Sequence, residues 1–123
     1  MKRPEQDLQA SVVAYLFAAL PDLPWYAVPN YAGNLGPRIG GLFKRLGKRA
    51  GVPDLAFVLP NGAAAFIELK AGKGSLDPAQ RDFRDSLPHG ALWAEARSVI
   101  EVQDILERWL TPFGWNLRAR VAA

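Results

Sequence analysis

Two carboxylates and a lysine stand near the ends of two apolar segments between Gly51 and Lys70. Asp54 follows a proline and opens the first apolar segment, and Glu68 and Lys70 close the second. Burying charge beside apolar side chains is unfavourable by several kcal/mol unless an opposite charge or a metal ion compensates for it. Carboxylate oxygens are the ligands that hard divalent cations prefer. The segment therefore indicates a magnesium site suited to phosphodiester chemistry.

Side chains along a strand alternate between its two faces, and this alternation decides which residues can act together. Asp54–Leu59 and Ala63–Lys70 are predicted to be strands, joined as a hairpin at Pro60-Asn61-Gly62. Glu68 and Lys70, two residues apart, then share one face of the second strand.

The length of the hairpin loop decides whether Asp54 joins that face. A strict two-residue loop at Asn61-Gly62 would pair Asp54 with Leu69 and would put its carboxylate on the wrong face. A loop of three or five residues, or a bulge at the preceding proline, would pair Asp54 with Glu68 or Lys70 instead. A functional site therefore requires a non-minimal loop or a kink.

If the faces agree, Asp54 and Glu68 can share a divalent cation with a backbone carbonyl. Such a site leaves positions for water and phosphate oxygens and suits magnesium or manganese. Lys70 would contact the attacking water and the phosphate as an orienting group, an electrostatic stabiliser or a base. The alternative is an ordinary surface ion pair at a strand end, between Lys70 and one of the two acids.

The composition excludes several other kinds of site. The 123 residues fit one domain, and 50% hydrophobic with 22% charged residues predicts a packed core. No cysteine is present, which excludes disulfides, thiolate catalysis and cysteine-bound zinc. The one histidine, His89, lies in a Pro-His-Gly turn, which argues against histidine zinc sites and serine–histidine triads. No apolar run reaches transmembrane length and no signal-peptide core is found, so we expect a cytoplasmic protein without a membrane partner.

Positive charge is concentrated in one glycine-rich segment. The formal net charge is +3, and no acidic residue occurs between Asp22 and Asp54. A basic segment of this kind can approach phosphates closely and gains from counterion release, which favours a polyanion partner over a solvated loop. The predicted DNA-contacting residues are Arg38, Lys44, Arg45, Lys48 and Arg49, with Lys73 beyond the hairpin.

The remaining elements predict an α/β domain around a small mixed sheet, in the order α-β-β-β-α-β-α. We expect a single domain over residues 1–123, with a core of about residues 5–110 and a tail over 111–123 that packs on the domain or on a partner. Asp77 is placed to cap a helix whose first residue is Pro78. Apart from the hairpin, the expected elements are a helix over 4–20, a strand over 25–29, one or two helical turns over 42–49, a helix from Asp77 to near Pro88, a strand over 91–96 and a helix over 98–110.

Three motifs in this order resemble the PD-(D/E)XK nuclease superfamily, which has a restriction-endonuclease-like core. They are Gly51-Val52-Pro53-Asp54-Leu55, Ile67-Glu68-Leu69-Lys70, and Gln80 in the opening turn of a helix. More narrowly, the chain resembles the VRR-NUC group, whose members show a glycine-x-proline-aspartate-leucine segment and a downstream glutamine. Glu5 and Gln9 are spaced as in the opening helix of that group, and Leu76–Gln80 fits its Leu-Ser-x-x-Gln with aspartate in place of serine.

The resemblance implies a role for each matching residue. Asp54 and Glu68 would bind the metal, the backbone carbonyl of Leu69 would complete the site, and Lys70 would be the catalytic lysine. Gln80 would lie near the metal or the phosphate, although it could equally form a capping box at the start of its helix.

Three further polar residues match the group's pattern. Glu5 would be an accessory acid, near enough to bind a second metal or its waters, although it could equally complement the helix dipole. Gln9 lies on the inward face of the same predicted helix, or at the edge of the core. Asn30 follows a predicted strand at a place where the group often has an asparagine.

The resemblance further implies a magnesium-dependent DNA endonuclease, in which manganese can substitute, without a small-molecule cofactor. Single-domain members of the group resemble Holliday-junction resolvases, so the implied assembly is a homodimer that acts on branched DNA. Aromatic residues such as Trp25, Tyr26, Tyr31 and Phe43 could form a dimer face, stack on unpaired bases, or pack within the domain. The alternatives are a nickase or flap nuclease of a phage or mobile element, and an inactive nucleic-acid-binding module.

Overall fold

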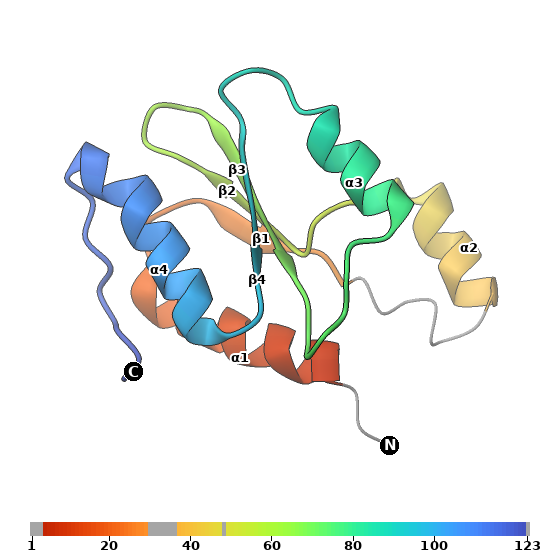
Figure 1. Cartoon of the computed structure of the whole chain (residues 1–123), viewed down its shortest axis with the longest axis horizontal. Helices are drawn as coiled ribbons and strands as arrows, with labels where there is room; N and C mark the ends of the chain where they lie inside the picture. The colour runs from red at the N-terminus through yellow and green to blue at the C-terminus, as the bar shows by residue number, and fades with distance from the viewer. Residues whose placement is uncertain (1–3, 30–36, 48, 123) are drawn as a thin grey trace.

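A four-stranded mixed sheet organises the chain (Figure 1). The computed structural model describes residues 4–29, 37–47 and 49–122. The elements are α1 (Pro4–Ala19), β1 (Trp25–Ala27), α2 (Pro37–Arg45), β2 (Leu55–Val58), β3 (Ala64–Leu69), α3 (Pro78–Asp85), β4 (Leu92–Ala96), α4 (Val99–Leu110) and the short 3-10 helix η2 (Thr111–Phe113). The strands lie in the order β1-β2-β3-β4, with the first two pairings antiparallel and β3–β4 parallel. The predicted mixed sheet is thereby confirmed.

One face of the sheet carries the hydrophobic core. α1 and α4 lie on this side, and α3 lies on the other (Figure 1). Because side chains alternate along each strand, Leu55 of β2 and Ile67 of β3 share the core face and are fully buried. They belong to one cluster with Leu16 of α1 and Leu106 of α4. Among the described residues, no helix combines the length and the apolar character needed to cross a membrane.

The helix α2 corrects the predicted order of elements. The sequence predicts helical turns over residues 42–49, whereas α2 begins at Pro37 and ends at Arg45, so the order is α-β-α-β-β-α-β-α. Gly40 and Gly41 each disfavour a helix by about 1 kcal/mol, which favours interpreting the segment as a loop. The proline at the first helical position is well tolerated there, and it starts the helix before the glycines. Ile39 and Phe43, four residues apart, are half-buried on one side of α2, and this partial burial favours the helix.

The β2–β3 hairpin has the non-minimal loop that a functional site requires. The Leu59 N–H donates to the Ala63 carbonyl at 2.9 Å, which leaves the three residues 60–62 as the loop. Extending the register of β2 and β3 by one residue pairs Asp54 with Glu68. Both side chains therefore point to the face opposite the core, and the predicted register is confirmed.

The tail beyond η2 packs on this domain. The Tyr15 hydroxyl of α1 donates to the Ala119 carbonyl at 3.0 Å, and the Val121 N–H donates to Gln103 Oε1 of α4 at 2.7 Å. Gln103 is itself buried. The tail thus holds α1 and α4 together at a distance from the face that carries the acidic residues.

Replacing Gln103 by alanine is expected to lower the free energy of unfolding by about 1–3 kcal/mol, because the half-buried Val121 N–H loses its acceptor. Thermal melts followed by circular dichroism would measure the change. The matched control is Arg108→Ala, at an exposed position of the same helix. Equal stability of the Gln103 variant and the wild type would show that the tail contributes nothing to the fold.

Candidate active site

Asp54 is fixed at the point where the β2–β3 ladder ends. Pro53 has no N–H to donate, and the next amide in the ladder, that of Leu69, donates instead to Asp54 Oδ2 at 2.7 Å. The Asp54 carbonyl accepts a hydrogen bond from the Val28 N–H at 2.8 Å, which ties it to the end of β1. Asp54 is only 6% exposed. Its carboxylate is therefore held beside β3 by the backbone and not by chance packing.

Glu68 lies opposite Asp54 and carries an unsatisfied oxygen. The side chain is 3% exposed, and its Oε1 accepts a hydrogen bond from Gln80 Nε2 at 2.7 Å. Its Oε2 is buried without a hydrogen-bond partner in the described part of the chain. Burial, and then the negative charge of Asp54, raise the pKa of Glu68 to about 8, while Lys70 opposes the shift.

An orphaned carboxylate oxygen beside a second carboxylate fits a hard divalent cation, which prefers oxygen ligands. Among the described residues, no three histidine, cysteine, aspartate or glutamate side chains lie together in a way that could hold a metal. The side chains that would bind the cation are thus those of Asp54 and Glu68. The remaining ligands would come from the backbone, water or substrate.

Lys70 is buried on the same face as the two acids. The side chain is 8% exposed and forms no ion pair with either acid in the part of the chain that the structure describes. Its Cδ lies 3.8 Å from the point where a Cβ on Gly74 would stand, so the aliphatic part of the side chain passes close to the loop after β3. This is not the surface ion pair considered as the alternative, since all three groups are buried.

Gln80 joins the first turn of α3 to the acidic pair. Its N–H donates to Asp77 Oδ1 at 2.9 Å, and its Oε1 accepts from the Asp77 N–H at 3.0 Å, forming a capping box. The amide nitrogen of the same side chain donates to Glu68. The capping box that the sequence allowed is therefore present and leaves Gln80 in contact with Glu68, while a position near a metal or a phosphate stays a prediction.

Gly51 sets how closely the loop before Asp54 approaches α3. Its φ is +78°, and a Cβ at this position would lie 2.2 Å from the Ala79 carbonyl oxygen and 2.9 Å from the Gln80 nitrogen. Only glycine allows both this conformation and this contact. The loop that carries Asp54 and the turn that carries Gln80 are thus packed backbone against backbone.

Arg97 supports the loop that follows Lys70, and sequence analysis missed it. Its guanidinium donates to the carbonyls of Gly72 and Gly74 at 2.6 Å each and pairs with Glu95 at 2.6 Å. Glu95 is the register partner of Glu68 across β3 and β4. Arg97 thus neutralises the acid next to the site. The sequence predicts a strand at β4, but it does not show which strand lies beside β4 or which residues of the two strands pair.

The two polar residues of α1 lie at the margin of this arrangement. Gln9 Nε2 donates to the Val28 carbonyl at 3.1 Å, which places Gln9 at the edge of the core. Glu5 is exposed, and its negative charge contributes to the raised pKa of Glu68. Its Oε1 lies 3.9 Å from the point where a Cβ on Gly74 would stand. An accessory role for Glu5 stays a prediction, and Asn30 lies outside the described residues.

The described basic residues are exposed and come from three segments. α2 presents three of them, Arg49 lies between α2 and Asp54, and Lys73 is in the loop after β3. Lys48 lies outside the described residues. Contact of these residues with DNA stays a prediction. The five exposed residues predicted to contact DNA are Arg38, Lys44, Arg45, Arg49 and Lys73.

Comparison with known proteins supports the fold. No family model and no curated protein matches this chain. A solved structure, a VRR_NUC domain protein, superimposes with a TM-score of 0.67 and 22% sequence identity, covering 90% of this chain and 91% of the other. The chain therefore has a mixed α/β fold similar to that of the VRR_NUC domain protein. The predicted PD-(D/E)XK-like core is confirmed at the level of the fold.

Replacing Gly51 by alanine is expected to reduce stability by about 1–3 kcal/mol and to disturb Gln80, because the new methyl group would overlap the Ala79 carbonyl. Gly62→Ala is the matched control, since Gly62 has a φ of +87° but open space around it. Chemical denaturation measures both variants. A Gly51 variant no less stable than the Gly62 variant would contradict the close packing.

The metal-free protein is expected to lose stability as the pH rises from about 4.5 to about 8. Over this range the folded state retains a proton on Glu68 that the unfolded state releases, because the folded pKa is raised. Glu68→Gln removes this dependence, so its advantage over the wild type grows with pH. Thermal melts in EDTA at several pH values test this, with the exposed substitution Asp104→Asn on α4 as the control. A stability difference between the variant and the wild type that does not change with pH would contradict the prediction.

Proposed function

We propose that the protein is a metal-dependent DNA endonuclease that hydrolyses phosphodiester bonds with Mg²⁺, for which Mn²⁺ can substitute. The observation that carries the proposal is the buried pair Asp54 and Glu68, with Lys70 buried on the same face and the Oε2 atom of Glu68 without a hydrogen-bond partner among the described residues. The nuclease-type fold supports the same conclusion.

These residues have little value as structural elements. Removing charges from water is costly, and a buried pair of like charges adds repulsion, so apolar residues would stabilise the sheet better. Perturbed ionisable groups concentrate where chemistry requires them. A cation bound between the two carboxylates would offset both their negative charge and the missing hydrogen bond of Glu68 Oε2. The free-energy cost of burying the two acids is then compensated.

Each residue has a role that follows from its position. Asp54 and Glu68 would hold the cation together with the Leu69 carbonyl, and Gln80 fixes one oxygen of Glu68 so that the other stays available. When bound, the cation would lower the pKa of a coordinated water and neutralise charge on the phosphate. Lys70 would orient the attacking water and stabilise the charge that develops on the phosphate.

The substrate class follows from charge. The net charge is +3, and the exposed cations of α2 and Lys73 lie around the site, as a phosphate backbone requires. Branched DNA as the preferred substrate and a homodimer as the active assembly belong to the proposal by analogy of fold. A nickase, a flap nuclease and an inactive binding module are the other outcomes of the experiment below.

Cleavage of labelled four-way junction, flap and linear duplex DNA with Mg²⁺ or Mn²⁺ tests the proposal. Asp54→Asn and Lys70→Ala are expected to lower the rate by about 10²- to 10⁴-fold, because each removes a group that acts on the reacting phosphate or water. EDTA is expected to abolish cleavage. Symmetric cuts in the junction would support a resolvase-like dimer.

The matched control is Asp104→Asn, an exposed substitution on α4 outside the site. Cleavage that persists in EDTA would contradict the metal-dependent mechanism. Binding of all three DNAs without cleavage in either metal would support the inactive binding module instead.

A further inference from the structure

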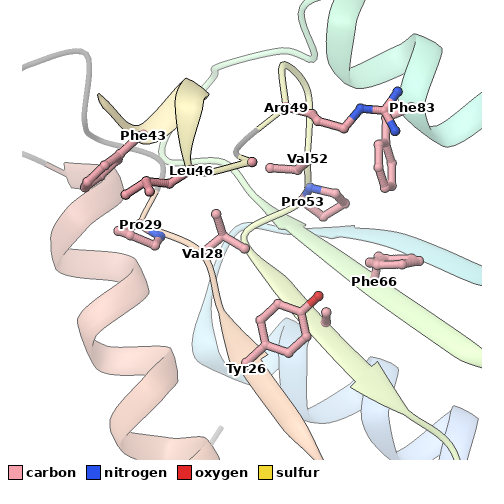
Figure 2. Close-up of a pocket in the computed structure, with 12 residues that line it drawn as sticks. Tyr26, Val28, Pro29, Phe43, Leu46, Arg49, Val52, Pro53, Phe66 and Phe83 are labelled. Carbon is pink, nitrogen blue, oxygen red and sulfur yellow. The ribbon is translucent and has the colours of Figure 1, made fainter. Parts of the chain in front are cut away.

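An apolar pocket of about 510 Å³ lies beside the acidic pair, on the face of the sheet opposite the core. Aromatic rings from four different elements line it, and Figure 2 shows them arranged around the same hollow. They are Tyr26 of β1, Phe43 of α2, Phe66 of β3 and Phe83 of α3.

The pocket adjoins the proposed metal site directly. Val52 and Pro53, the two residues before Asp54, form part of its wall. Phe66 precedes Glu68 by two residues on the same face of β3, which corresponds to about 7 Å along the strand. A group bound in the pocket would therefore stand within one nucleotide's reach of a phosphate held at the acidic pair.

The lining suits a flat and weakly polar ligand. Phe66 and Phe83 meet edge to face with their centroids 5.5 Å apart, which fixes both rings. Tyr26 is 62% exposed and lines the pocket, so a ligand can reach its side chain. Arg49 is the charged residue among the described residues of the lining. Nucleobases stack on such rings, and the pocket lies within the usual size range of small-ligand sites, roughly 300–1,000 Å³.

The surrounding charge favours an anionic ligand over a second copy of this chain. Lys44 and Arg45 end the helix that carries Phe43, and Arg49 lies on the pocket wall itself. A symmetric contact between two copies at this surface would bring these cations together, which is unfavourable. A nucleic acid brings an aromatic base and a negative phosphate together, matching both features.

We propose that this pocket binds an unpaired nucleobase next to the phosphodiester to be cut. The inference rests on the proposed nuclease function and narrows its substrate to DNA with an unpaired nucleotide beside the cut. A base within an intact duplex is stacked and paired, so it cannot enter the pocket unless it leaves the helix. Stacking on Tyr26 would then place the adjoining phosphate over Asp54 and Glu68.

Binding without cleavage tests the pocket separately from catalysis. Fluorescence anisotropy in EDTA would compare labelled oligothymidine of about 15 nucleotides with an abasic strand of the same length. Tyr26→Ala is expected to weaken binding of the oligothymidine by roughly 5- to 140-fold, and to leave binding of the abasic strand unchanged. Tyr26→Phe keeps the ring and is expected to bind like the wild type.

The matched control is Phe113→Ala, which removes an exposed ring on η2, outside the pocket lining. It is expected to bind both strands like the wild type. Because Tyr26 is largely exposed, its truncation leaves the core in place, and a thermal melt verifies this. In a cleavage assay, the wild type is expected to cut an oligothymidine with one abasic nucleotide at the mapped cleavage position more slowly than the intact oligothymidine.

Equal affinity of the wild type for the two strands would overturn the proposal. A Tyr26→Ala variant that binds DNA like the wild type but has an altered sedimentation coefficient would also overturn the proposal. That result would assign the pocket to contact with a second copy of the chain. Cleavage with base-independent binding would refute the pocket and retain the nuclease. Base-dependent binding without cleavage in any metal would retain the pocket and refute the nuclease.

Discussion

The hydrogen bond from the Leu69 amide to Asp54 Oδ2 is the interaction on which the candidate site depends. It forms because a three-residue loop sets the hairpin register and because Pro53 ends the backbone ladder. A shift of one residue would turn Asp54 toward the core and leave Glu68 alone on its face. The geometry of a short turn thus decides whether two acids of this chain can share a cation.

The buried acidic pair is energetically unfavourable, and contacts in the surrounding segments hold it in place. Two buried acids repel each other, and Glu68 Oε2 lacks a partner within the described part of the chain. The capping box of α3, the backbone contact at Gly51 and the guanidinium of Arg97 hold the segments that carry these groups. Stability is therefore supplied around the site, as is common where binding or chemistry needs strained electrostatics.

Sequence reasoning identified the parts of the site that are encoded locally. The alternation in β3, the need for a non-minimal loop and the cap at Asp77 follow from short-range rules, and the structure agrees with them. The helix α2 was predicted only in part, as one or two turns over residues 42–49, because its glycines disfavour a helix. Arg97 beside Glu95 and the aromatic pocket could not be predicted, since both depend on which distant segments become neighbours.

A crystal structure of the protein grown with Mn²⁺ and a short DNA strand would test the central claim most directly. The account predicts an anomalous peak between Asp54 and Glu68, with Glu68 Oε2 about 2.1 Å from the metal. Lys70 would lie beside the nearest phosphate. A DNA-bound structure with no metal between these carboxylates, or with the metal elsewhere and cleavage intact, would contradict it.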